Sequence, residues 1–159
     1  MTGLFDEPAS ASPPSPSPSP EARREVVAIY SDGGARGNPG PAAIGAVVLD
    51  PTTEPPTRLA TVSECIGVAT SNVAEYRAVI AALEAAREFP SRRLQVRADS
   101  MLVIRQLEGV WRVKQPHLKP LHARALELLR AYESVDLAHV PREQNVDADL
   151  LVNAALDAG

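Results

Sequence analysis

A change of hydrophobic periodicity near residue 70 constrains the fold of this chain more than any other feature. Before it, short apolar runs joined by segments rich in glycine and proline predict three successive strands, at residues 26–30, 44–49 and 59–66. After it, apolar residues at helical spacing alternate with further strand-like runs, which predicts a helix at 73–89, a strand at 94–98, helices at 101–107 and from 120, a strand at 135–140 and a last helix through 156. Asn72 and Asn145 are the expected N-caps of the first and last helices.

This order of elements predicts an α/β fold. Three strands in succession favour an antiparallel meander, whereas a strand that returns after a helix usually lies parallel to its neighbour. We therefore expect a mixed five-stranded sheet, antiparallel through strands 1–3 and parallel for strands 4 and 5, flanked by helices. Residues 25–159 suffice for one domain, and the proline- and serine-rich residues 1–24 are predicted to be a disordered tail.

Composition narrows the class of protein. The single cysteine, Cys65, excludes an internal disulfide, is predicted to be buried, and fits a reducing compartment. No apolar run is long enough to span a membrane and no signal-peptide pattern is present, so we expect a cytoplasmic protein with no membrane or protein partner. The net charge of −4 argues against binding nucleic acid through the overall field, so any such binding must use local contacts.

Four acidic residues fall where strands end or helices begin. Asp32 and Asp99 end the first and fourth predicted strands, and Glu75 and Asp149 lie in the first turns of two helices. If those strands are parallel neighbours, the two aspartates lie side by side, where open α/β sheets usually bind ligands. Four carboxylates that close together repel one another unless cations lie between them. Oxygen ligands suit Mg²⁺ or Mn²⁺, and a pair of such ions is the usual catalyst of phosphodiester hydrolysis.

Each acid by itself also has an ordinary structural explanation. Asp32 precedes two glycines and suits a turn. Glu75 stands three residues after Asn72 and would complete a capping box. Asp99 suits a helix entry, and Asp149 a solvated position near a helix N-terminus. Only the coincidence of the four positions indicates a metal site.

The segments around these acids resemble the motifs of the ribonuclease HI family. They stand in the family's order at residues 30–41 (YSDGGARGNPGP), 70–75 (TSNVAE), 98–100 (ADS) and 145–149 (NVDAD), and the resemblance extends from about Val26 to Asp157. It implies an endonuclease that hydrolyses the RNA strand of RNA–DNA hybrids with two divalent ions, Mg²⁺ or alternatively Mn²⁺. It also implies that the catalytic metal ligands are Asp32, Glu75, Asp99 and Asp149, the last preferred over Asp147 because it stands four residues after Asn145.

The resemblance extends to contacts with the hybrid. It implies that Asn38 and Asn72, with nearby groups of Gly33 and Ser71, contact the minor groove and the 2′-hydroxyls that distinguish RNA from DNA. The long basic handle of some members is reduced to a short segment, as in the archaeal-type and actinobacterial branch. Within it, Arg112 and Lys114 beside Trp111 would form a surface for the DNA backbone; alternatively Trp111 packs at a helix junction.

The chain departs from the family pattern near the last motif. The loop that often carries a catalytic histidine is compressed to residues 141–144, and His139 is expected to belong to the preceding strand. Arg142 or Glu143 is a possible substitute, and Met101 stands where glutamine is frequent. Three alternatives stay open: another nuclease on the same fold, such as an exonuclease or resolvase, a non-catalytic nucleic-acid-binding module, and a structural domain that once carried activity. The Asn38 and Asn72 motifs argue against the first, and four retained acids argue against the second because negative charge weakens phosphate binding.

Overall fold

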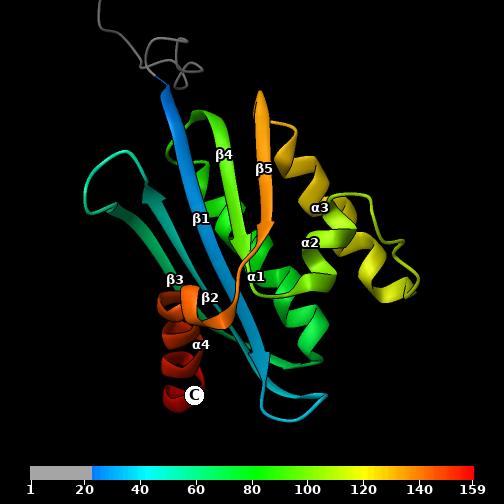
Figure 1. The fold of residues 1–159 in the computed structure, drawn as a ribbon. Coiled ribbons are helices and arrows are strands. Elements are labelled where there is room, and N and C mark those ends of the chain that lie inside the picture. Colours follow the sequence, from blue (N-terminus) through cyan, green and yellow to red (C-terminus); the bar gives the residue numbers. More distant parts are fainter. Residues whose placement is uncertain (1–22) are drawn as a thin grey trace, which may run out of the picture.

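The computed structural model describes residues 23–159, so nearly all of the predicted tail lies outside the described residues. A twisted five-stranded sheet with the strand order β3-β2-β1-β4-β5 forms its centre (Figure 1). The strands are β1 (Arg24–Ala35), β2 (Gly40–Asp50), β3 (Thr57–Ala69), β4 (Ser91–Ala98) and β5 (Ser134–His139). Strands β1 to β3 pair antiparallel, and β4 and β5 continue the sheet parallel to β1. This topology confirms the predicted mixed sheet.

Helices cover both faces of the sheet. They are α1 (Ser71–Ala86), α2 (Met101–Leu107), α3 (Lys119–Leu129) and α4 (Val146–Ala158), with 3-10 turns η3 (Pro116–Leu118) and η4 (Arg142–Gln144). Residues of α1, α2 and α3 share one buried cluster with the sheet, whereas α4 packs separately against Ala43 of β2 (Figure 1). None of the helices in the described part of the chain is long and apolar enough to cross a membrane.

The main core lies between the sheet and α1. Ile29 of β1, Leu83 of α1 and Leu94 of β4 are almost completely buried there. On β2, Ala46 and Val48 belong to this core, whereas Ala43 faces α4, as the alternation of side chains along a strand requires. Because both faces of β2 are covered, its run from Ala42 to Val48 is buried without interruption.

Two local predictions are wrong. Strand β1 does not break at Gly33 and Gly34 but runs to Ala35, because these residues pair with Ile44 and Ala43 of β2. Helix α1 begins earlier than expected, and its N-cap is Thr70, whose side chain accepts a hydrogen bond from the Val73 amide at 3.2 Å. Tertiary pairing in the first case, and a competing cap two residues upstream in the second, outweigh the local sequence preference.

Cys65 is exposed, so the prediction that it is buried is also wrong. It lies on β3, which is an edge strand of the sheet and has more exposed positions than β1 or β2. Its thiol donates to the Ala155 carbonyl of α4 at 3.0 Å. The residue type therefore did not predict the burial of Cys65, because the position of a strand within the sheet decides how many of its side chains are covered by other elements.

Candidate active site

The register between β1 and β4 brings Asp32 and Asp99 together. The last pair of the parallel ladder is Ser31 with Ala98. Asp32 is the next residue of β1, and Asp99 is the residue that directly follows β4. Asp32 is buried at 5% exposure, and Asp99 is half-buried. The prediction that parallel pairing places these two side chains at one end of the sheet is confirmed.

Glu75 reaches the same place from α1. It lies five residues into α1, beyond the first turn, and one of its carboxylate oxygens accepts the Gly33 amide at 3.0 Å. The contact is close because Gly33 has no side chain: a Cβ there would lie 2.2 Å from the Ala74 backbone. Glu75 is therefore held against β1 and does not cap the helix.

The carboxylates of Asp32, Glu75 and Asp99 converge, with one oxygen of each lying within 4.8 Å of the others. Asp149 of α4 is half-buried and lines a pocket of about 360 Å³ with Asp32 and Glu75. It is near enough to Asp32 to raise the pKa of that carboxyl. Acids from three segments that are far apart in the sequence thus form one cluster, and a fourth borders it.

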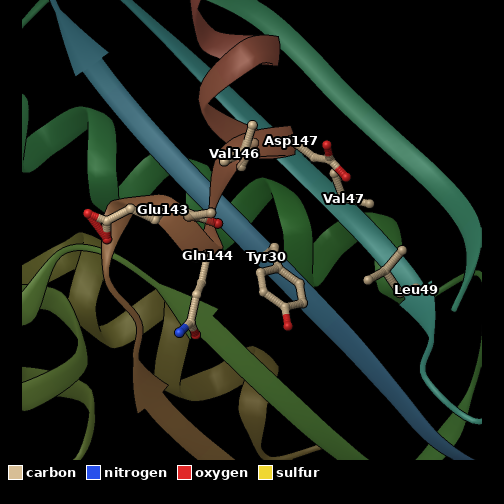
Figure 2. A pocket seen from close by; sticks show the side chains of 9 residues that line it. Tyr30, Val47, Leu49, Glu143, Gln144, Val146 and Asp147 are labelled. Atoms are coloured by element: carbon tan, nitrogen blue, oxygen red, sulfur yellow. The ribbon is translucent and has the colours of Figure 1, made fainter. Parts of the chain in front are cut away.

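Asp147, the alternative acid of the last motif, points elsewhere. It forms an exposed ion pair with Arg58 of β3 at 2.9 Å. It also lines a separate pocket of about 200 Å³ on the α4 side of the sheet, and Figure 2 shows it beside Val47 of β2. The geometry therefore favours Asp149, two positions further along the helix, as the residue that belongs to the acidic cluster.

The cluster is electrostatically unfavourable without a counter-charge. Burial, followed by the charges of Asp99 and Asp149, raises the pKa of Asp32 to about 8. Burial also raises the pKa of Glu75 well above its usual value, with smaller contributions from Asp32 and Asp99. The Gly33 amide and the Arg142 guanidinium act in the opposite direction on Glu75, but they do not reverse the effect.

The donor set fits a divalent cation. Carboxylate oxygens are hard ligands of the kind that Mg²⁺ and Mn²⁺ prefer. One oxygen of Asp99, Oδ1, is buried and has no hydrogen-bond partner among the described residues. A buried carboxylate oxygen without a partner is costly, and a cation would satisfy it.

Comparisons with known proteins agree with this geometry. Residues 30–155 match the family model described as reverse transcriptase-like. Ribonuclease HI of Halobacterium salinarum is 46% identical over 128 residues, which cover 80% of this chain and 63% of that protein. Its crystal structure matches with a TM-score of 0.79 at 45% identity, covering 84% of this chain and 99% of that one.

The chain belongs to the ribonuclease H family. A bifunctional protein of Mycobacterium tuberculosis is 46% identical over 132 residues, which are 83% of this chain but only 36% of that longer protein. The structure of its N-terminal RNase H domain superimposes with a TM-score of 0.80 at 45% identity, covering 84% of this chain and 95% of the solved one. LC11-RNase H1, solved in complex with an RNA/DNA hybrid, has a TM-score of 0.76 at 44% identity over 83% of this chain and 97% of its own. This ribonuclease H-family chain therefore spans about a third of its mycobacterial relative.

The predicted hybrid-binding residues of this ribonuclease H-family chain, except Asn38, line two hollows. Ser71 lines the acidic pocket, together with Gly33. Asn72, the next residue of α1, lines a neighbouring groove of about 430 Å³ with Arg112 and Lys114. The N-terminal turn of α1 thus separates the acids from the basic segment and borders both.

Two of these residues are also engaged within the protein. The Gly33 amide donates to Glu75, so it positions an acid. The side-chain oxygen of Asn38 accepts the Ser71 amide at 3.0 Å, which ties the β1–β2 turn to the start of α1. Asn38 is otherwise exposed, and its amide NH₂ is available to a ligand.

Trp111 is 45% exposed and lines the groove beside Arg112. It is therefore not buried at a helix junction, which was the packing alternative. His139 is the last residue of β5, as expected, and is exposed. Arg142 of η4, in contrast, lines the acidic pocket and acts through its charge on Glu75.

Sequence reasoning missed the structural role of Asn145 in the ribonuclease H site. Asn145 is the N-cap residue of α4, as predicted, but its side chain forms no capping bond; its NH₂ instead donates to the Ser31 carbonyl at 2.8 Å. Asn145 is 1% exposed, so this bond ties the start of α4 to the strand position next to Asp32. The sequence signal for this role was the place of Asn145 in the fourth motif, but an N-cap alone already accounted for an asparagine at that position.

Proposed function

We propose that this chain is an endonuclease that hydrolyses the RNA strand of RNA–DNA hybrids. The observation that carries the proposal is the convergence of Asp32, Glu75 and Asp99, with Asp149 beside them, at the end of the parallel strands. Membership of the ribonuclease H family and 44% identity to LC11-RNase H1, whose structure contains an RNA/DNA hybrid, support the substrate assignment. Because the chain covers only part of its mycobacterial relative, the proposal concerns the activity of this domain.

The four acids would hold two divalent ions, which we propose to be Mg²⁺ or Mn²⁺. When bound, such ions supply Lewis acidity and a hydroxide-like nucleophile at neutral pH. The chain itself contributes rigid placement of the ligands, because Asp32 sits within a paired strand and Glu75 is tied to the Gly33 amide. Rigid placement matters because ligands that need no rearrangement during the reaction stabilise the transition state most.

Residues around the acidic pocket and around the neighbouring groove would together recognise the hybrid. We assign Asn38, Ser71 and Asn72 to the minor groove and the 2′-hydroxyls, which only the RNA strand carries. Arg112 and Lys114, with Trp111 between α2 and η3, would contact the DNA strand on the far side of α1's first turn. Gly33 would contribute indirectly, by holding Glu75.

Arg142 is our candidate for the role that a loop histidine has in other family members. It is the cation whose charge acts on Glu75, and it lines the acidic pocket on the side where α4 begins. A guanidinium in that place would attract the scissile phosphate and stabilise the negative charge that develops on it. Arg142→Ala should lower kcat by more than tenfold, the range that loss of a charged transition-state contact produces, whereas His139→Ala should have little effect. The reverse order of the two effects would assign the role to His139.

Cleavage of matched substrates tests the main proposal. The purified chain should cut a labelled RNA–DNA hybrid in Mg²⁺ or Mn²⁺, leave duplex RNA and duplex DNA of the same sequence intact, and be inactive in chelator. Asp99→Asn is the control for a contaminating nuclease. Cleavage of DNA duplexes would instead favour another nuclease on this fold, and binding without cleavage would indicate a non-catalytic module.

A further inference from the structure

A buried polar network connects α1 to the basic segment of the groove. Its centre is Gln106 of α2, which is only 5% exposed. The side-chain oxygen of Gln106 accepts the Tyr76 hydroxyl of α1, and its side-chain NH₂ donates to the Arg112 carbonyl at 3.3 Å. Burial raises the pKa of Tyr76 to about 12, so the hydroxyl keeps its proton and is the donor.

The network is anchored on a second side by His122 of α3. Its ring nitrogen Nε2 lies 3.0 Å from the main-chain carbonyl of Gln106, and its ring meets that of Tyr76 edge-on, with centroids 6.4 Å apart. Tyr76 is fully buried, so it cannot shift without breaking core packing. Gln106 of α2 is thus held in place by contacts with α1 and α3.

The segment that Gln106 holds has few other anchors. Between the end of α2 at Leu107 and the start of η3 at Pro116, the backbone has no regular structure. The amides of Val110 and Trp111 donate to the Arg105 carbonyl, and the side chains of Arg112 and Lys114 are exposed. The middle of this segment is connected to the core by the bond from Gln106 to the Arg112 carbonyl and by the side chain of Val113, which packs against the main core.

Tyr76 stands next to Glu75 and one helical turn after Asn72. Gln106 therefore connects the helix that carries an acidic ligand and a hybrid-binding residue to the segment that carries the basic residues. Gln106 itself forms part of the groove lining between Asn72 and Arg112. The Gln106 side chain thus binds α1 on one side of the groove through its oxygen and the basic segment on the other side through its nitrogen, so it sets the distance between them.

We propose that Gln106 is a positioning residue, which sets the basic segment at residues 110–114 relative to α1 and thereby determines how tightly the DNA strand is held. This inference rests on the proposed function, because it concerns the affinity of the same site for hybrids. Gln106 does not touch the acids, so it acts on binding and not on the hydrolytic step.

Gln106→Met keeps the length of the side chain and removes both hydrogen bonds. It should raise KM for the hybrid roughly two- to tenfold, the factor that corresponds to one ordinary hydrogen bond, and leave kcat within about twofold of the parent. Tyr76→Phe removes only the hydroxyl and should raise KM by a smaller factor. Ser91→Ala is the matched control: it removes a buried side-chain bond to the Arg93 carbonyl at the opposite end of β4, and should lower stability without raising KM.

A mutant cycle separates positioning from general destabilisation. In the background of Arg112→Ala with Lys114→Ala, Gln106→Met should have no further effect on KM, because the groups that it positions are gone. The same rise of KM in both backgrounds, or no rise in the parent background, would overturn the proposal.

The position of the basic segment can also be measured without an activity assay. Trp111 is the single tryptophan of the chain, so fluorescence anisotropy and iodide quenching report on this segment alone. Gln106→Met should lower the anisotropy and increase quenching relative to both the parent and Ser91→Ala; unchanged values would refute the inference. A parent that fails to cleave hybrids would refute the proposed function, whereas the fluorescence result would still decide whether Gln106 positions the segment.

Discussion

At the scale of single residues, the acids of the cluster differ in how they are held. Asp32 is fixed by the strand, Glu75 by a main-chain amide, and Asp99 has a buried oxygen with no hydrogen-bond partner within residues 23–159. Replacement of a carboxylate by the amide of the same shape therefore removes charge and keeps packing. This makes the conservative variants informative.

Asp99→Asn should abolish metal-dependent cleavage while the protein stays folded. The reason is that the variant lacks one ligand charge but still fills the same space at the end of β4. Glu75→Gln should do the same, although its side chain can still accept the Gly33 amide. Cleavage rates beside circular dichroism spectra check both; substantial cleavage by these two variants would remove the acids from the mechanism.

The raised pKa of Asp32 predicts a pH dependence of stability. Since this pKa rises from 3.8 to about 8 on folding, the metal-free folded state binds a proton that the unfolded state has released between those values. The contribution of Asp32 is therefore most favourable near pH 4 and is lost as the pH rises toward 8. Tm in chelator should fall over that window for the parent, and less steeply for Asp32→Asn.

Mg²⁺ extends the same test. It should raise the Tm of the parent most at pH 8, where the acids are ionised and a ligand that binds only the folded state stabilises it. Asp32→Asn should gain less from Mg²⁺ and melt above the parent in chelator. A parent Tm that is insensitive to both pH and metal would show that the acids do not repel as described.

At the scale of elements, α4 must be placed accurately, because it carries Asp149. Gly45 of β2 allows the close approach: a Cβ there would lie 2.4 Å from the Ala148 carbonyl. The Asn145 side chain then ties the start of the helix to Ser31, and Arg58 pairs with Asp147 at the surface. Only the first two of these contacts are buried.

Asn145→Ala should therefore cost both stability and activity. Removing this side chain deletes its buried hydrogen bond to the Ser31 carbonyl, which costs about 0.5–1.5 kcal/mol, and frees the start of the helix that carries Asp149. Arg58→Ala is the matched control, since an exposed ion pair contributes about 0–1 kcal/mol. Chemical denaturation and cleavage kinetics measure both effects. Equal losses for the two variants would mean that Asn145 has no special role in placing α4.

At the scale of the whole molecule, the net charge of −4 opposes the binding of a polyanion. Binding must then depend on a few local cations, of which Arg112 and Lys114 border the groove. We expect a shallow dependence of affinity on salt, because each phosphate contact adds about 0.9 to the logarithmic slope on B-form DNA.

Removing Arg112 and Lys114 together should raise KM and flatten the salt dependence, with little change of kcat. Neither residue lines the acidic pocket, so neither is expected to act on the scissile phosphate. Cleavage kinetics of the double alanine variant over a salt series measure the effect. A KM and slope equal to those of the parent would show that this segment does not contact the hybrid.

Much of this molecule is decided by local sequence. Periodicity predicted the order of strands and helices, and the rule that strands returning after helices lie parallel predicted the mixed sheet. On the condition that the first and fourth strands are parallel neighbours, the positions of Asp32 and Asp99 at their ends predicted that the two residues meet. The ladder from Val27 with Leu94 to Ser31 with Ala98 confirms that condition.

The remaining features depend on contacts between residues that are distant in the sequence. The path of β1 through Gly33 and Gly34, the exposure of Cys65 on an edge strand, and the bond from Asn145 to Ser31 are examples. Another is the ion pair that holds Asp147 at the surface, because it requires Arg58 on β3. Local propensities differ by about 1 kcal/mol or less, whereas pairing and burial are worth more, so only the tertiary structure could decide these positions.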